Sequence, residues 1–210
     1  MNVGQVGGNI MKLHWNPASP FARKCLVCAA EAGVELDLIT RSGTALMTSN
    51  MPLEHNPLGK IPALERSDGP AIYDSRVITQ YLAAQSEYDF YPEVRIWEVL
   101  TLEATADGMM EAAVLMVYEG RTRPKNKQFP DWVEAQWSKI DRSLNTLEER
   151  WIGHLVGPLD AAQIAVGCAL EYLDFRHESR DWRSGRPQLA AWQANFAKRE
   201  SMSSTVPENL

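Results

Sequence analysis

Three short motifs, in a fixed order near the start of the chain, constrain this sequence more than any other feature. They are SPFARK at residues 19–24, NPLGKIP at 56–62 and the pair DS at 74–75. Ser19 follows a predicted strand and opens a helix, whose first N–H groups point outward and attract negative charge. Pro62 opens a strand, and Asp74-Ser75 opens another helix. Together the motifs predict one small-molecule site that suits an anionic, peptide-like ligand with a thiolate.

The first 85 residues alternate between strand and helix signals. Ser19 is a suitable N-cap with Pro20 at the first helical position, and Gly33 is suited to end that helix. A hairpin signal at 67–70 separates two short strands. The expected order is a strand at 12–15, helix at 20–32, strand at 35–40, short helix near 45–49, strands at 62–65 and 71–73, and a helix capped by Ser75. This β-α-β-α-β-β-α order is the thioredoxin-like α/β arrangement, with a parallel pair first.

Strand signals vanish after a plausible linker at residues 86–92. Long helical patterns follow at 93–120, 129–152 and 160–175, with a shorter one at 187–198. The helix from Asp160 is apolar nearly all round, which predicts a central place in a bundle. Asp160 and Gln163 have capping-box spacing. We therefore expect a disordered or appended extension at 1–10, an α/β domain at 11–85, the linker at 86–92 and an all-α domain at 93–210.

Composition excludes several classes of function. The net charge of −6 argues against nucleic acid as a partner, and no uncharged apolar run approaches the ~20 residues of a membrane span. Residues 1–10 lack the features of a signal peptide. Three cysteines fit a reducing cytoplasm better than a disulfide framework. The basic cluster of Arg121, Arg123, Lys125 and Lys127 is interpreted as a solvated loop rather than an anion site.

The ordered motifs resemble those of the cytosolic glutathione S-transferases, in particular bacterial members with a serine at the start of the first helix. The resemblance runs from residue 11 to about residue 207 and includes DAAQIAVGCALEYLDFR at 160–176. It implies a glutathione site in the N-terminal domain, an electrophile site between the domains, and a homodimer. Where glutaredoxins carry Cys-Pro-Tyr-Cys, this chain has Ser19-Pro20-Phe21-Ala22, so disulfide exchange by a protein dithiol is not expected.

The resemblance assigns the catalytic role to Ser19. A free thiol has a pKa of about 8.5, and a helix N-terminus or a hydrogen-bond donor lowers it. The Ser19 hydroxyl is expected to donate to the sulfur of glutathione, which is the co-substrate. The alternative is that Ser19 is an N-cap only, although both roles can coexist.

The glutathione-binding residues implied by the resemblance come from the other two motifs. Pro62 resembles the family's cis-proline, which presents the backbone of Ile61 to the peptide part of glutathione; an ordinary trans-proline is the alternative. Ser75 is expected to hold the α-carboxylate of the γ-glutamyl end and Asp74 its ammonium, although the pair could serve as a cap alone. Many relatives have Glu in place of Asp74. Lys60, and less directly His55, are candidates for the glycyl carboxylate.

The remaining candidates are expected by position in the family. The electrophile pocket would draw on Trp15, Asn16, Met110, Val114 and Tyr118. Glu103, Asp107 and Glu111 share a helix face, where like charges disfavour one another. Either the stripe is solvated, or Asp107 meets glutathione bound to the neighbouring subunit.

Neither a metal nor a redox pair is expected. The other three histidines, His14, His154 and His177, show no ligand spacing, so a metal site is improbable. Cys25 and Cys28 lie mid-helix and are expected to pack rather than react.

Three functions remain open on the sequence alone. The leading one is an enzyme that conjugates the glutathione thiolate to small hydrophobic electrophiles. The second is glutathione-dependent reduction of peroxides or disulfides. The third is a glutathione-binding interaction protein with little turnover, since fold does not fix function.

Overall fold

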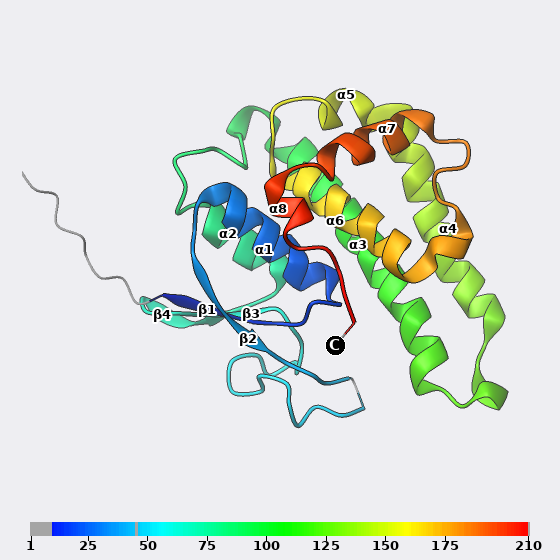
Figure 1. Ribbon diagram of the computed structural model, residues 1–210, viewed down its shortest axis with the longest axis horizontal. Coiled ribbons are helices and arrows are strands. Elements are labelled where there is room, and N and C mark those ends of the chain that lie inside the picture. The colour runs from blue at the N-terminus through cyan, green and yellow to red at the C-terminus, as the bar shows by residue number, and fades with distance from the viewer. Residues whose placement is uncertain (1–9, 45, 210) are drawn as a thin grey trace, which may run out of the picture.

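The computed structural model describes residues 10–44 and 46–209. It consists of an α/β domain followed by an all-helical domain, so the predicted fold class is confirmed (Figure 1). Residues 1–9 of the expected N-terminal extension lie outside the described residues. None of the described helices is both long enough and apolar enough to cross a membrane.

Four strands form a mixed sheet with the order β2-β1-β3-β4. The strands are β1 (Met11–Trp15), β2 (Leu36–Thr40), β3 (Ala63–Arg66) and β4 (Gly69–Ile72). β1 pairs parallel with β2 and antiparallel with β3, and β3 pairs antiparallel with β4. Helices α1 (Pro20–Ala32) and α2 (Ser75–Ala83) lie together over one face of the sheet (Figure 1).

The helix ends of this domain follow the sequence with two corrections. Gly33 ends α1 in the left-handed conformation with φ 69°, as expected. The N-cap of α2 is Asp74 and not Ser75, because Asp74 Oδ1 accepts from the Arg76 N–H at 3.0 Å. The short helix expected near 45–49 is wrong: residues 46–49 hold a turn and a bridge between Thr44 and Met47 instead.

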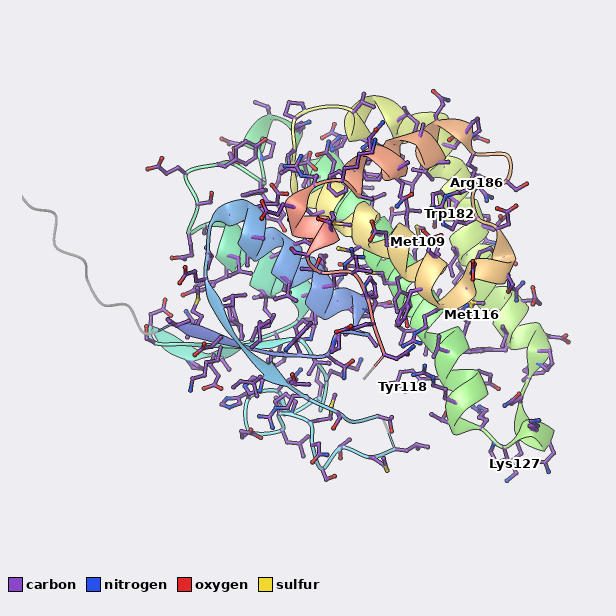
Figure 2. The ribbon with its side chains drawn as sticks, in the orientation of Figure 1. Met109, Met116, Tyr118, Lys127, Trp182 and Arg186 are labelled. Atoms are coloured by element: carbon purple, nitrogen blue, oxygen red, sulfur yellow. The ribbon has the colours of Figure 1, made fainter. Side chains whose placement is uncertain are left out.

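The second domain is a helical bundle. Its elements are η1 (Glu93–Arg95), α3 (Ile96–Thr122), η2 (Lys125–Lys127), α4 (Pro130–Thr146), a π-helical turn η3 (Leu147–Trp151), α5 (Ile152–Leu155), α6 (Ala161–His177), η4 (Glu178–Arg180), α7 (Pro187–Phe196) and α8 (Glu200–Ser203). The pattern at 129–152 thus covers α4 and η3 and ends at the first residue of α5, while α8 had no clear signal in the sequence. In Figure 2, Met109 and Met116 lie in the interior of this bundle.

Helix α6 is the centre of the bundle, as its apolar circumference predicted. Its residues from Ala161 to Leu170 are all buried. Gly167 lets α7 approach closely, because a Cβ there would lie 2.7 Å from the ring of Phe196. The capping box is present: Asp160 Oδ1 accepts from the N–H groups of Ala162 and Gln163, and Gln163 Oε1 accepts from the Asp160 N–H.

Replacing Asp160 by alanine should destabilise the bundle. Asp160 is fully buried, and its other oxygen contacts His154 Nε2 at 2.8 Å, so several donors lose their acceptor at once. We expect Asp160→Ala to lower the free energy of unfolding by about 2 kcal/mol. Asp131→Ala, at an exposed first-turn position of α4, is the control, and urea denaturation measures both. Equal effects of the two substitutions would contradict this role of the cap.

Candidate functional site

The starts of α1, β3 and α2 meet at one edge of the sheet. His14 near the end of β1 pairs with Ala63 at the start of β3, and Leu64 pairs with Ile72 at the end of β4. The segments that follow β1 and β4 are the turns into α1 and α2, so topology alone brings the three sequence motifs together. Cys25 Sγ of α1 lies 3.9 Å from the carbonyl oxygen of Ser75, which ties the two helices at this place.

Ser19 caps α1 through the oxygen of its side chain. Its Oγ accepts from the Ala22 N–H at 3.2 Å, and its own N–H donates to the Asn16 carbonyl at 2.9 Å. The Ser19 hydroxyl hydrogen has no acceptor among the described residues. Phe21 contributes one of the first N–H groups of the helix, which lack an intrahelical acceptor. This corner therefore presents an O–H and an N–H to a ligand, at the positive end of the helix.

The turn between β1 and α1 is held by Asn16. Its Nδ2 donates to the Arg41 carbonyl at 2.8 Å, and its Oδ1 accepts from the Ala18 N–H at 2.9 Å. Asn16 thus shapes the turn with its amide group. Trp15 is half-buried beside it, and its Nε1 is buried without a partner among the described residues.

The loop before β3 presents the backbone of Ile61. Buried Asn56 closes this loop, because its Nδ2 donates to the Lys60 carbonyl at 2.9 Å and its Oδ1 accepts from the Leu58 N–H. Gly59 has φ 60°, a conformation that favours glycine. The Ile61–Pro62 peptide bond is cis, as expected. Among the described residues, neither the N–H nor the carbonyl of Ile61 takes part in a backbone hydrogen bond.

The start of α2 forms a second corner with polar groups that lack a partner among the described residues. Ser75 is buried, and its hydroxyl makes no hydrogen bond within the described part of the chain. Asp74 is exposed and pairs with Arg76 Nη2 at 2.9 Å. Partial burial works to raise the pKa of Asp74, but the hydrogen bonds from Arg76 outweigh it and hold that pKa below its ordinary value. Lys60 is exposed and forms no ion pair with any described residue.

A buried ion cluster lies behind this corner, between the two domains. Lys24 of α1 is fully buried, and its Nζ lies 2.7 Å from Asp107 Oδ1 and 3.2 Å from Glu103 Oε1, both on α3. Thr79 of α2 and Tyr91 of the linker contact the same Glu103 at 3.1 and 3.2 Å. The cluster therefore joins α1, α2, the linker and α3.

This cluster corrects the interpretation of the acidic stripe. Glu103 and Asp107 are buried, at 2% and 3% exposure, so solvation is wrong for both and holds only for exposed Glu111. Burial raises the pKa of each of the two carboxyls, despite the nearby Lys24 charge. Burial also opposes the charged form of Lys24, yet the two carboxylates raise its pKa above the ordinary value. The sequence alone did not identify Lys24 as part of this cluster. The available signal was the otherwise unexplained stripe of like charges formed by Glu103, Asp107 and Glu111.

His55 belongs to a second cluster, which joins the loop before β3 to β1 and β3. Its ring stacks on buried His14 at 4.7 Å, and its Nε2 lies 3.5 Å from Glu65 Oε1. These three side chains are close enough to hold a metal ion. Arg41 Nε donates to His14 Nδ1 at 2.9 Å, which leaves the proton of His14 on Nε2, facing Glu65 at 2.8 Å. The nitrogen that faces the cluster is therefore already protonated, and the arrangement favours a hydrogen-bonded support for the loop.

The expected electrophile residues do not all lie at the surface. Met110 is 1% exposed and belongs to the core, whereas Val114 and Tyr118 are half-buried on α3. Figure 2 shows Tyr118 on the side of α3 that faces the C-terminal tail. Cys25 and Cys28 are buried in α1, and burial raises the pKa of Cys28 to about 12, in agreement with a packing role.

Comparison with known proteins identifies the family. Two family models match, the glutathione S-transferase N-terminal domain at residues 18–85 and the glutathione S-transferase C-terminal domain at residues 130–193. The "Uncharacterized GST-like protein YibF" of Escherichia coli strain K12 is 34% identical and covers 94% of this chain and 98% of its own length. The chain belongs to the glutathione S-transferase family.

Two solved structures of glutathione transferase family members, each with a bound ligand, are also similar to this chain. A glutathione transferase family member from Pseudomonas fluorescens Pf-5, with bound glutathione, is 41% identical, covers 95% of this chain and 100% of its own, and has a TM-score of 0.92. A second structure from that organism holds S-(propanoic acid)-glutathione, again at 41% identity, with 94% and 100% coverage and a TM-score of 0.87.

Removing the Lys24 amine should destabilise the protein at the contact between its two domains. In Lys24→Met, two buried carboxylates lose their closest cation, and only Arg76 remains near Asp107 at 3.7 Å, so we expect a loss of about 3–5 kcal/mol in the free energy of unfolding. Lys12→Met, at an exposed position of β1, should change it by less than about 0.5 kcal/mol. Guanidinium unfolding of both variants measures the difference, and a Lys24→Met variant as stable as wild type would contradict the structural role of the cluster.

Proposed function

We propose that this chain is a glutathione transferase that joins the thiolate of glutathione to small hydrophobic electrophiles. One observation carries the proposal: Ser19 uses its oxygen to cap α1 and keeps its hydroxyl hydrogen for a ligand. A donor in that place stabilises a thiolate and not a thiol. The dipole of α1 adds about 0.3–1 kcal/mol when exposed, and more when partly buried.

The reaction needs no further protein group at the sulfur. The thiolate electron pair forms a C–S bond to the electrophilic carbon. The displaced pair either departs with a leaving group or moves to an adjacent activated carbon, which takes a proton from water. Positioning of the two reactants and stabilisation of the thiolate supply the rate enhancement.

We assign the remaining glutathione contacts to polar groups of the site, most of which have no hydrogen-bond partner among the described residues. The unpaired N–H and carbonyl of Ile61, presented beside Pro62, suit the cysteinyl backbone of glutathione as a short added strand. The Ser75 hydroxyl and N–H suit the γ-glutamyl α-carboxylate, and Asp74, ionised at neutral pH, suits its ammonium. Exposed Lys60, which has no ion pair among the described residues, suits the glycyl carboxylate, and His55 stabilises the loop by stacking on His14.

Relatives support conjugation chemistry in particular. The Pseudomonas fluorescens structures hold glutathione in one case and S-(propanoic acid)-glutathione in the other. The second ligand is a thioether, the kind of product that conjugation makes and that peroxide reduction does not.

The electrophile is expected to lie beside Ser19 and against α3. Trp15, Val114 and Tyr118 are half-buried and available for this contact, with Asn16 shaping the turn and Met110 packing behind it. We also propose a homodimer in the cytoplasm. The contact of Asp107 with glutathione of the neighbouring subunit stays a prediction, and in its own chain Asp107 holds Lys24.

Ser75→Ala should weaken glutathione binding. The variant removes a hydroxyl that no described residue uses, so its folding should be intact, and we expect the dissociation constant of reduced glutathione to rise by about tenfold or more. Ser67→Ala, at an exposed serine of the β3–β4 turn, is the control and should bind as wild type. Calorimetric titration measures all three proteins. If wild type does not bind at millimolar glutathione, the proposal is wrong.

A panel of substrates should separate the three functions. We expect conjugation of aryl halides and activated alkenes to exceed turnover of cumene hydroperoxide by at least about tenfold. Conjugation is followed by the loss of free thiol. Peroxide reduction is followed by the coupled oxidation of NADPH. A reversed ratio would identify a peroxidase, and binding without turnover in either assay would identify a glutathione-binding protein.

A further inference from the structure

The segment at residues 41–60, between β2 and β3, is attached to the sheet by polar side chains rather than by the apolar core. Of the described residues in this segment, none belongs to the main core cluster, although Met51 is buried. Figure 1 shows the segment on the side of the sheet opposite α1 and α2. Because the segment leads directly to Ile61, its attachment to the sheet decides where the backbone of Ile61 is presented.

Five side chains form a closed ring of contacts between this segment and the sheet, called the His14 ring below. His14 Nε2 donates to Glu65 Oε1 at 2.8 Å, and His55 Nε2 lies 3.5 Å from the same oxygen. His55 Nε2 lies 3.7 Å from Glu54 Oε1, which accepts from Arg41 Nη2 at 3.3 Å. Arg41 Nε closes the ring by donating to His14 Nδ1 at 2.9 Å. Within the described part of the chain, every side-chain hydrogen bond or ion pair that joins residues 41–60 to β1 or β3 involves His14 or Glu65.

The contact between Arg41 and His14 exists only while His14 is neutral. A guanidinium group has donors and no acceptor, so His14 Nδ1 must offer a lone pair to Arg41 Nε. A proton on Nδ1 would place two donors 2.9 Å apart and add a positive charge beside the guanidinium. His14 is only 1% exposed, so water is not available to replace the lost contact. Protonation of His14 therefore breaks the ring at Arg41.

The groups that face His14 set the pH at which this occurs. Burial lowers the pKa of His14 below its ordinary value of 6.5, the hydrogen bond with Glu65 opposes this effect, and the charges of Arg41 and His55 support it. Further charged groups on this side of the sheet are Lys12 of β1, Asp37 of β2 and Glu54. Because the pKa is lowered in the folded state, the stabilisation from the ring is complete above about pH 6.5 and is lost as the pH falls below that value.

The backbone of Arg41 connects the ring to the turn before Ser19. The Arg41 carbonyl accepts from Asn16 Nδ2 at 2.8 Å, and the Arg41 N–H donates to the Trp15 carbonyl at 2.8 Å. The Asn16 carbonyl in turn accepts from the Ser19 N–H at 2.9 Å. Release of the Arg41 side chain therefore loosens a residue that braces both the loop before β3 and the turn into α1.

We propose that His14 is a positioning residue for glutathione binding, and that its protonation releases residues 41–60 and weakens the binding site in acid. The inference rests on the proposed function and names the regulation of that site. Only neutral His14 can accept from Arg41 and donate to Glu65 at the same time, so the closed ring requires the neutral form.

Equilibrium binding of S-methylglutathione tests this role, because its sulfur carries no proton that could titrate. Between pH 5 and pH 7 the carboxylates of the probe stay ionised and its ammonium stays protonated. Asp74 also stays ionised, since its pKa lies below the ordinary value of 3.8. We expect the dissociation constant for wild type, measured by calorimetry, to rise about threefold or more from pH 7 to pH 5. His14→Gln can still donate to Glu65 but takes up no proton in this range, so it should lose most of that rise.

Hydrogen exchange adds a readout of the segment itself in the protein without ligand. The N–H groups of Asn56 and Gly59 donate to the carbonyls of Pro52 and Asn56 at 2.7 and 2.9 Å. After correction for intrinsic rates, we expect their protection in wild type to fall about threefold or more from pH 7 to pH 5. In His14→Gln the protection should be the same at both pH values. Mass spectrometry of the peptide at residues 51–62 measures both proteins.

His177→Gln is the matched control. His177 is a half-buried histidine of α6 whose pKa is also lowered by burial, and its Nε2 contacts the Ala113 carbonyl at 3.0 Å, outside the His14 ring. It should keep the pH dependence of wild type. If His14→Gln fails to fold, Arg41→Met decides the test. That variant lacks the contact that protonation breaks, so it should bind more weakly than wild type at pH 7 and change little further at pH 5.

The outcomes separate this inference from the proposed function. Wild-type affinity that is equal at both pH values, or higher at pH 5 because protonated His55 strengthens its contacts with Glu54 and Glu65, would overturn the inference while glutathione binding stands. A pH dependence that survives in His14→Gln or in Arg41→Met would do the same. Failure of both S-methylglutathione and reduced glutathione to bind wild type at pH 7 would overturn the inference and the proposed function together.

Discussion

One buried ammonium group joins α1 of the first domain to α3 of the second. Lys24 points from the middle of α1 into α3, where Asp107 holds it with both oxygens and Glu103 with one. Burying an isolated charge costs several kcal/mol, and the two carboxylates, with Thr79 and Tyr91 as further partners of Glu103, offset that cost. The cluster therefore sets the position of α1 relative to α3. The first turn of α1, only one turn before Lys24, is held in place relative to α3, and the proposed position of the electrophile lies between these two helices.

The candidate site depends on backbone and hydroxyl groups that the packed domains hold in position. Ser19, Ile61 and Ser75 come from three segments far apart in the sequence, and each offers N–H, C=O or O–H groups that the fold itself leaves without a partner. Sheet topology brings the three segments to one edge, and side chains such as Asn56 and Asn16 lock the loops between them. The arrangement is therefore preorganised before any ligand arrives, which is what thiolate stabilisation requires.

The sequence predicted local structural features well, but it predicted contacts between residues far apart in the chain poorly. Caps at Ser19 and Asp160, the end of α1 at Gly33 and the cis bond at Pro62 depend on neighbouring residues or on a recognised motif, and all are confirmed. Lys24 was missed because a lysine in a helix is ordinarily exposed, and only the fold shows that Glu103 and Asp107 face it. For the same reason Met110 was assigned to a pocket although it packs in the core. The roles of Ser19, Lys60, Ile61, Asp74 and Ser75 stay predictions.

The pKa of the glutathione thiol in the binary complex tests the central claim most directly. Ultraviolet absorbance of the thiolate, followed from pH 5 to pH 10, gives this value for wild type, Ser19→Ala and Ser19→Thr. The account predicts a pKa at least about one unit below the free thiol value of about 8.5 in wild type, return toward that value in Ser19→Ala, and retention in Ser19→Thr, whose hydroxyl can still donate. A bound thiol that titrates like free glutathione in wild type, or equally in all three proteins, would contradict it.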